Sequence, residues 1–175
     1  MSNTTTPPST ALVRSAYEHC RRIAIGMLTS QGDLPPQLFF VGRPAQGDDA
    51  ASSKIARVGT QAMATFHANQ ASADQLIPFI RRTLDPASEE GKALRKQIGP
   101  CKIAVHACHA LVPADPPLQY PDNAKPALRP DGRRECILIT VHTLAHSATL
   151  YCPVYRDAAG ALQAAHAPWA SDGGF

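Results

Sequence analysis

The chain has 175 residues, of which 44% are hydrophobic and 18% charged, and its formal net charge is +3. That length suits one globular domain and is short for two, and the composition argues against a disordered chain or a coiled coil. A small positive charge spread over a whole domain does not indicate a nucleic-acid or membrane partner. We therefore expect a single domain over residues 10–167, with a flexible segment before it (1–9) and a tail after it (168–175).

The cysteines and the first residues of the chain indicate the cellular compartment in which the protein is expected. The five cysteines contain no CxxC pair, so a disulfide framework is not indicated. The first residues lack the basic and apolar regions of a signal peptide, and no run approaches the roughly 18 apolar residues of a membrane helix. We expect a cytoplasmic protein without a membrane segment.

The first predicted element is a helix from Thr10 to Ser30. Apolar residues recur there at helical spacing and arginines lie opposite them. Ser9 or Thr10 can cap its start, and Gly32 can end it. The short apolar run Gln37–Val41 then predicts a buried strand.

The segments that follow are harder to assign. Residues 43–54 are polar and predict a loop. Side chains at residues 55–62 alternate between two faces as in a strand, although the alanines and the methionine that continue to residue 66 would suit a helix. We predict a strand here.

Two helices are expected between residues 72 and 98. Ser72 and Gln75 resemble a capping box, with Pro78 either marking a start near Ile77 or kinking the helix. Asp85-Pro86 predicts the start of the next helix, as an N-cap followed by a first-turn proline. Gly99-Pro100 ends it.

The rest of the chain is expected to form strands. They are predicted at 101–112, at 135–144 and 149–155 as a hairpin, and at 161–167, with a proline-rich loop over 113–130. Pro153 cannot donate to a ladder, so its strand should be an edge or bulged there. The order predicts an α+β fold, in which a mostly antiparallel sheet of four to six strands has two or three helices packed on one face.

The chain resembles a group of small uncharacterised bacterial proteins. The resemblance spans most of residues 10–156 and rests on two short motifs, Leu34–Val41 and Pro130–Glu135. It implies the same α+β fold and no activity, because none is assigned to the group. In that group the strand matching 105–110 usually carries a Glu and a Trp, whereas this chain has Ala107 and His109. A site built on those residues would be lost here, or replaced by histidines and cysteines.

Histidines and cysteines are the unusual chemistry of this sequence. Strand alternation places His106 and Cys108 on one face, with His109 on the other, and gives Cys136 and His142 a shared face on the next strand. If the two faces meet, these four residues form a nitrogen and sulfur set suited to zinc or to a thiol site. Packing of buried free cysteines explains the same pattern and is favoured, because the spacing is not that of a zinc motif.

Basic doublets on the predicted helices offer a third interpretation. Arg81, Arg82, Arg95 and Lys96 would form one phosphate-binding patch if the helices lie side by side. Acidic neighbours and the lack of interleaved aromatic residues favour ordinary solvated helix surfaces instead. Likewise, Glu135 beside Arg133 and Arg134 is expected to form a surface ion pair of little energetic value.

No nucleophile elbow, glycine loop or HExxH pattern is present, which favours a non-catalytic protein. The leading hypothesis is a module that binds a protein partner or a second copy of itself through its long strand pair. A metal or thiol protein using His106, Cys108, Cys136 and His142 is the first alternative, and nucleic-acid binding through the basic doublets is the second. No cofactor is expected unless zinc occupies that site, and no membrane partner is expected.

Overall fold

The computed structural model describes residues 7–45, 47–113 and 119–165. It confirms the α+β class: an antiparallel seven-stranded sheet runs in the order β2-β1-β3-β5-β6-β4, with β7 also paired to β6. The strands are β1 (Gln37–Gly42), β2 (Ile55–Arg57), β3 (Cys101–Val112), β4 (Lys125–Pro126), β5 (Arg134–His142), β6 (Ser147–Arg156) and β7 (Leu162–Ala164). The helices are α1 (Thr10–Gln31), α2 (Thr60–Phe66), α3 (Gln70–Ala73), α4 (Leu76–Leu84) and α5 (Glu89–Ile98), with a 3-10 turn at Ala50–Ser52.

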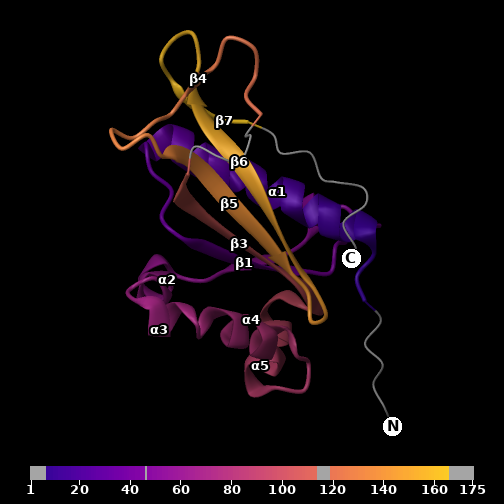
Figure 1. The fold of residues 1–175 in the computed structure, drawn as a ribbon. Coiled ribbons are helices and arrows are strands. Elements are labelled where there is room, and N and C mark those ends of the chain that lie inside the picture. The colour runs from indigo at the N-terminus through magenta and orange to yellow at the C-terminus, as the bar shows by residue number, and fades with distance from the viewer. Residues whose placement is uncertain (1–6, 46, 114–118, 166–175) are drawn as a thin grey trace.

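Helices cover both faces of the sheet, which corrects the expected single helical face. Figure 1 shows α1 on one side of the strands and α2 to α5 on the other. The reason lies in β3, which is apolar on both sides: Ile103 and Val105 belong to the core under α1, whereas Cys101 and Ala104 belong to the core under α4 and α5. A central strand of that kind is stable only when both faces are covered.

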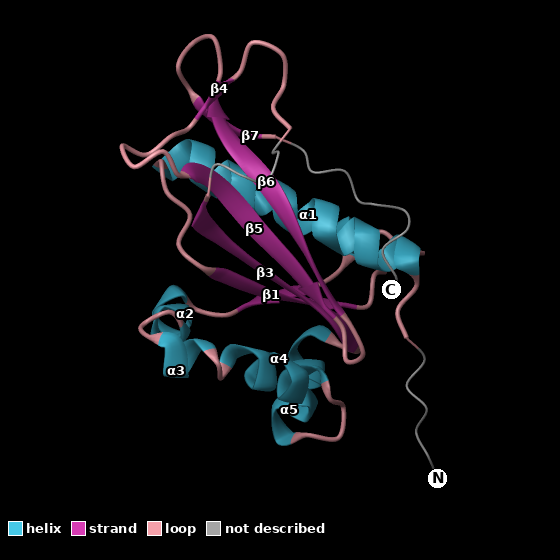
Figure 2. Cartoon of the chain, in the orientation of Figure 1, coloured by secondary structure: helices cyan, strands magenta, loops and turns pink. Residues whose placement is uncertain are grey.

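The second helical layer covers only part of its face. Its core is made with β1 and β3, through residues such as Leu38 and Phe40. Figure 2 shows α2 to α5 gathered beside β1 and β3, with the turn of the β5–β6 hairpin close to α4 and α5 and the open end of the hairpin extending away from them. This face therefore has a helix-covered half and a half formed by the hairpin.

The long first helix forms as its sequence predicts. Ser9 adopts an extended conformation and its hydroxyl accepts from the Leu12 N–H, while Gly32 closes the other end with a φ of 74°. A left-handed residue at this position is easiest for glycine, which has no Cβ. None of the helices in the described residues combines the length and the apolar character needed to cross a membrane.

The strand expected over 55–62 is wrong beyond its first residues. β2 ends at Arg57, and α2 begins at Thr60 after Gly59. Burial explains the change, since helical geometry places Met63 in the second core with no exposed surface. The alanines and the methionine were thus the better signal.

The helix starts also differ from those expected. Ser72 lies inside α3, where Asn69 is the cap, so the capping box at Ser72 is wrong. α4 begins at Leu76 and places Pro78 in its first turn, where a missing N–H costs little. Asp85 ends α4 rather than starting α5, which is capped by Ser88.

The hairpin of β5 and β6 is confirmed, with a short third strand inserted at its open end. The Ala127 N–H donates to the Val154 carbonyl and the Glu135 N–H donates to the Ala127 carbonyl, so β4 separates β5 from β6 there. The last strand is shorter than the expected 161–167, because β7 covers Leu162–Ala164; residues 166–175 lie outside the described part.

Pro153 lies where the chain after β7 meets the outer side of β6, so the strand is not a free edge at this position. Its carbonyl accepts from the Ala165 N–H at 2.7 Å, on the side of β6 away from β5. Because a strand residue directs its N–H and C=O to the same side, the donor that proline lacks also faces outward. The ladder to β5 therefore loses no hydrogen bond at this position.

Candidate functional site

A row of polar side chains crosses the second face of the sheet, where the helical layer gives way to the hairpin. His106 on β3 stands opposite Thr140 on β5, and Thr140 stands opposite Thr149 on β6. The two threonine hydroxyls are 2.9 Å apart, as expected of a close cross-strand pair. This row joins the covered half of the face to the hairpin half.

His67 reaches this row from the end of α2. Its Nε2 lies 3.3 Å from the Nε2 of His106, and the two rings are tilted by 32° with their centroids 5.3 Å apart. His67 is exposed and His106 is half-buried, so the pair is accessible from solvent on the His67 side. Sequence reasoning missed His67, because no local pattern links a residue at the end of a short helix to a strand 39 residues away.

The four residues of the sequence-predicted metal site share this face, as strand alternation requires. They are spread along it: Cys136 pairs with Pro153 at one end of β5, and His142 pairs with Ser147 at the other. Six residues of strand at about 3.3 Å each separate them by roughly 20 Å, too far for both to contact one ion. Within the described residues, no group of three or more His, Cys, Asp or Glu side chains is arranged to hold a metal ion.

The thiols on this face are held in their neutral form. Burial raises the pKa of Cys108 to about 11 and that of Cys136 to about 12. A protonated thiol is a poor nucleophile and a poor metal ligand at neutral pH. Their environment therefore suits packing better than thiol chemistry.

His142 lies two residues beyond Thr140 on β5, next to the turn of the hairpin. It is only 3% exposed, and its Nδ1 lies 2.8 Å from the Ser147 hydroxyl. Its Nε2 is buried without a hydrogen-bond partner. Burial, together with the Arg81 guanidinium, lowers the pKa of His142 to about 4, so this imidazole is neutral at physiological pH.

A second polar cluster lies on the α1 face, around His109. Its Nε2 is 3.2 Å from a Glu135 carboxylate oxygen, and its Nδ1 is 3.6 Å from Asp33. Arg129 binds the other Glu135 oxygen at 2.8 Å, so the expected pairing of Glu135 with Arg133 is wrong; Arg133 pairs with Asp131 instead. The Glu135 side chain is 15% exposed, so this pair is less screened than the surface pair that was expected. Ala107, the other position singled out by the resemblance, is part of the core.

The basic doublets lie at the C-terminal ends of two helices. Arg81 and Arg82 occupy the last turn of α4, and Arg95 and Lys96 the last turn of α5. Arg82 lies 3.4 Å from the Glu90 carboxylate, which neutralises part of its charge. Cations at helix C-termini also interact favourably with the helix dipole. Nucleic-acid binding through these residues stays a prediction.

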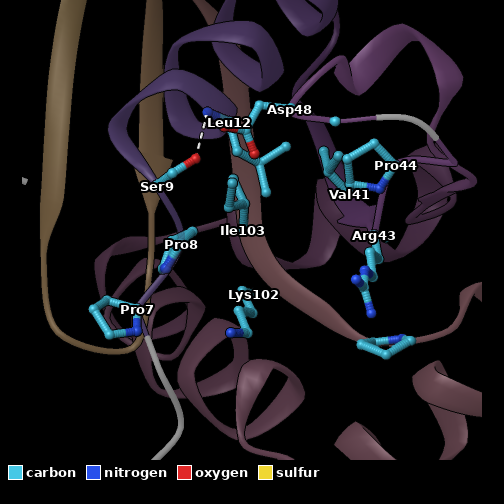
Figure 3. A pocket seen from close by; sticks show the side chains of 13 residues that line it. Pro7, Pro8, Ser9, Leu12, Val41, Arg43, Pro44, Asp48, Lys102 and Ile103 are labelled. Carbon is cyan, nitrogen blue, oxygen red and sulfur yellow. Dashed lines mark hydrogen bonds between the residues drawn. The ribbon is translucent and has the colours of Figure 1, made fainter.

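A cavity of about 430 Å³ lies at the start of α1. Figure 3 shows Arg43 and Lys102 beside it, with Leu12 and Ile103 forming apolar walls. Ser9, at its rim, already accepts the Leu12 N–H at 3.1 Å. Asp48 also lines the cavity, so apolar walls are combined there with side chains of both charges. The cavity lies on the α1 face of the sheet, and the histidine row lies on the opposite face, since Val41 and Ile103 in the cavity walls belong to the α1 core.

Known proteins provide no family for this chain. No family model, no curated protein and no solved structure matches it. The resemblance to small uncharacterised bacterial proteins stays a prediction.

Proposed function

We propose that the protein is a non-catalytic, self-associating module that dimerises through the outer edge of β6. The supporting observation is the pairing of that strand. β5 pairs with it from Ser147 to Pro153, whereas β7, on the outer side, takes only Val154–Arg156. Among the described residues, no strand pairs with the outer side of Ser147–Tyr151, which we call the β6 edge.

The composition of the β6 edge favours pairing with another strand. Its residues carry no charge, while native edge strands are usually blocked by lysine, proline or a bulge. Tyr151 is 45% exposed and Thr149 is exposed beside it. Aromatic and β-branched side chains on an open face are those that stabilise cross-strand pairs.

The outward hydrogen-bonding groups of this edge can be assigned. Pro153 faces outward, and residues of the same parity along the strand direct their N–H and C=O to the same side. Thr149 and Tyr151 therefore offer their backbone groups outward, while Leu150 bonds with β5. A second copy of the same edge, related by a twofold axis, supplies the complementary groups in antiparallel order.

Thr149→Pro should convert the dimer to a monomer. Proline at this position removes an outward donor and leaves the ladder to β5 intact, as Pro153 does four residues further along β6. The masses can be measured by light scattering after size-exclusion chromatography, over a range of concentrations. The wild type should have twice the chain mass of 18.7 kDa, and the Thr149→Pro variant should have the chain mass itself.

A second substitution guards against a proline variant that does not fold. Thr149→Lys places a charge on the edge and should also give a monomer, whereas Thr29→Lys, on the exposed surface of α1, should leave the dimer unchanged. A wild-type protein that is monomeric at every concentration up to about 1 mM would overturn dimerisation. A dimer that persists in a folded Thr149→Lys variant would place the interface elsewhere.

A further inference from the structure

We infer that His67 and His106 form a binding site for one zinc ion, with their Nε2 atoms as the two protein ligands. The site is separate from the proposed dimer edge, since His67 follows the last residue of α2 and His106 is on β3. It also differs from the four-residue set predicted from the sequence, because His67 replaces the cysteines and His142.

The separation of the two nitrogens matches a tetrahedral zinc ion. Zinc binds histidine nitrogen at about 2.0–2.1 Å, and two such bonds at the tetrahedral angle place their nitrogens about 3.3 Å apart. The Nε2 atoms of His67 and His106 are 3.3 Å apart. Two lone pairs can therefore converge on one ion with little movement of either ring.

The two elements that carry the ligands hold them in place. His106 is in the middle of β3, flanked by β1 and β5, so its backbone is fixed on both sides. His67 ends α2, where its N–H donates to carbonyls of the last turn. α2 is tied to the second core by Met63, which has no exposed surface. Pre-positioned ligands lower the entropic cost of binding an ion.

Both rings supply the imidazole nitrogen that zinc accepts as a ligand. Each ring keeps its single proton and carries it on Nδ1 when Nε2 binds the metal, so the two histidines release no net proton.

Water completes the coordination. Cys108 lies two residues along β3 on the same face, which puts it roughly 7 Å from His106 along the strand. The described residues offer no third ligand of the usual types. Zinc sites in proteins usually have three or four protein ligands, so a two-histidine site leaves two positions to water and binds the ion more weakly.

Zinc titration of the full-length, tag-free protein, stripped with a chelator, tests the site. Calorimetry should show one zinc ion bound per chain, and magnesium, which prefers oxygen ligands, should give no binding. His67→Gln should weaken zinc binding at least tenfold. His19→Gln, which removes a histidine from α1, should leave it unchanged.

His106→Asn gives an independent check, with folding verified by circular dichroism. It should weaken zinc binding as much as His67→Gln, and the double variant should lose no more than either alone, because one ligand cannot hold the ion. If zinc does not bind at concentrations up to about 1 mM, or binds the His67→Gln variant as tightly as the wild type, the pair is a hydrogen bond between two imidazoles and the inference fails.

Discussion

Replacing Gly91 with alanine is expected to destabilise the protein by about 3 kcal/mol or more. Gly91 is buried in the first turn of α5, and a Cβ there would overlap the Asp85 carbonyl oxygen and lie 2.8 Å from its carbon. That carbonyl accepts from the Ser88 N–H at the turn between α4 and α5. The methyl group would therefore push α5 away from the end of α4.

A matched control is available in α1. Gly26 is exposed in the helix interior, and a Cβ there would meet no atom within 4 Å. Gly26→Ala should stabilise the protein by about 1 kcal/mol, because alanine is the better helix former. Urea unfolding of both variants should give free energies that change in opposite directions. A Gly91→Ala variant as stable as the wild type would show that the turn has room for a methyl group.

Local signals in the sequence predict the elements that are stabilised locally. The cap at Ser9, the left-handed Gly32 and the two strands of the hairpin all stand where propensity and periodicity place them. The helix starts at Ser72 and Asp85 fail because two cap-like residues compete within a few positions. Asn69 and Ser88 are the actual caps, since their side chains accept backbone N–H groups from the first turns of α3 and α5.

Strand alternation predicts which face a side chain occupies but not its distance from other side chains. The shared face of Cys136 and His142 follows from their even spacing, yet the same spacing separates them along β5. The contact between His67 and His106 depends instead on where α2 packs. The contact of Glu135 with His109 depends on the register of β3 and β5, and its pairing with Arg129 depends on β4 folding back between β5 and β6. Such contacts arise from tertiary packing, which no local pattern in one sequence encodes.

Acid should weaken the fold through His142. Its native pKa of about 4 lies below the 6.5 of an unperturbed histidine, because burial disfavours the imidazolium. Between those values the unfolded chain binds a proton that the native chain does not. The stabilisation is therefore fully present above pH 6.5 and declines as the pH falls to about 4, by about 3 kcal/mol for this residue.

Urea unfolding at pH 7 and pH 4.5, in a chelating buffer, isolates this effect. The wild type should lose stability on acidification, and His142→Gln should lose about 2 kcal/mol less, because glutamine does not titrate. Carboxylate contributions are common to both proteins and cancel in the comparison. His106, whose pKa is also lowered to about 4, remains in the variant and keeps part of the acid sensitivity. An equal loss in both proteins would mean that His142 takes up its proton in the native state without cost, which its 3% exposure and its orphaned Nε2 argue against.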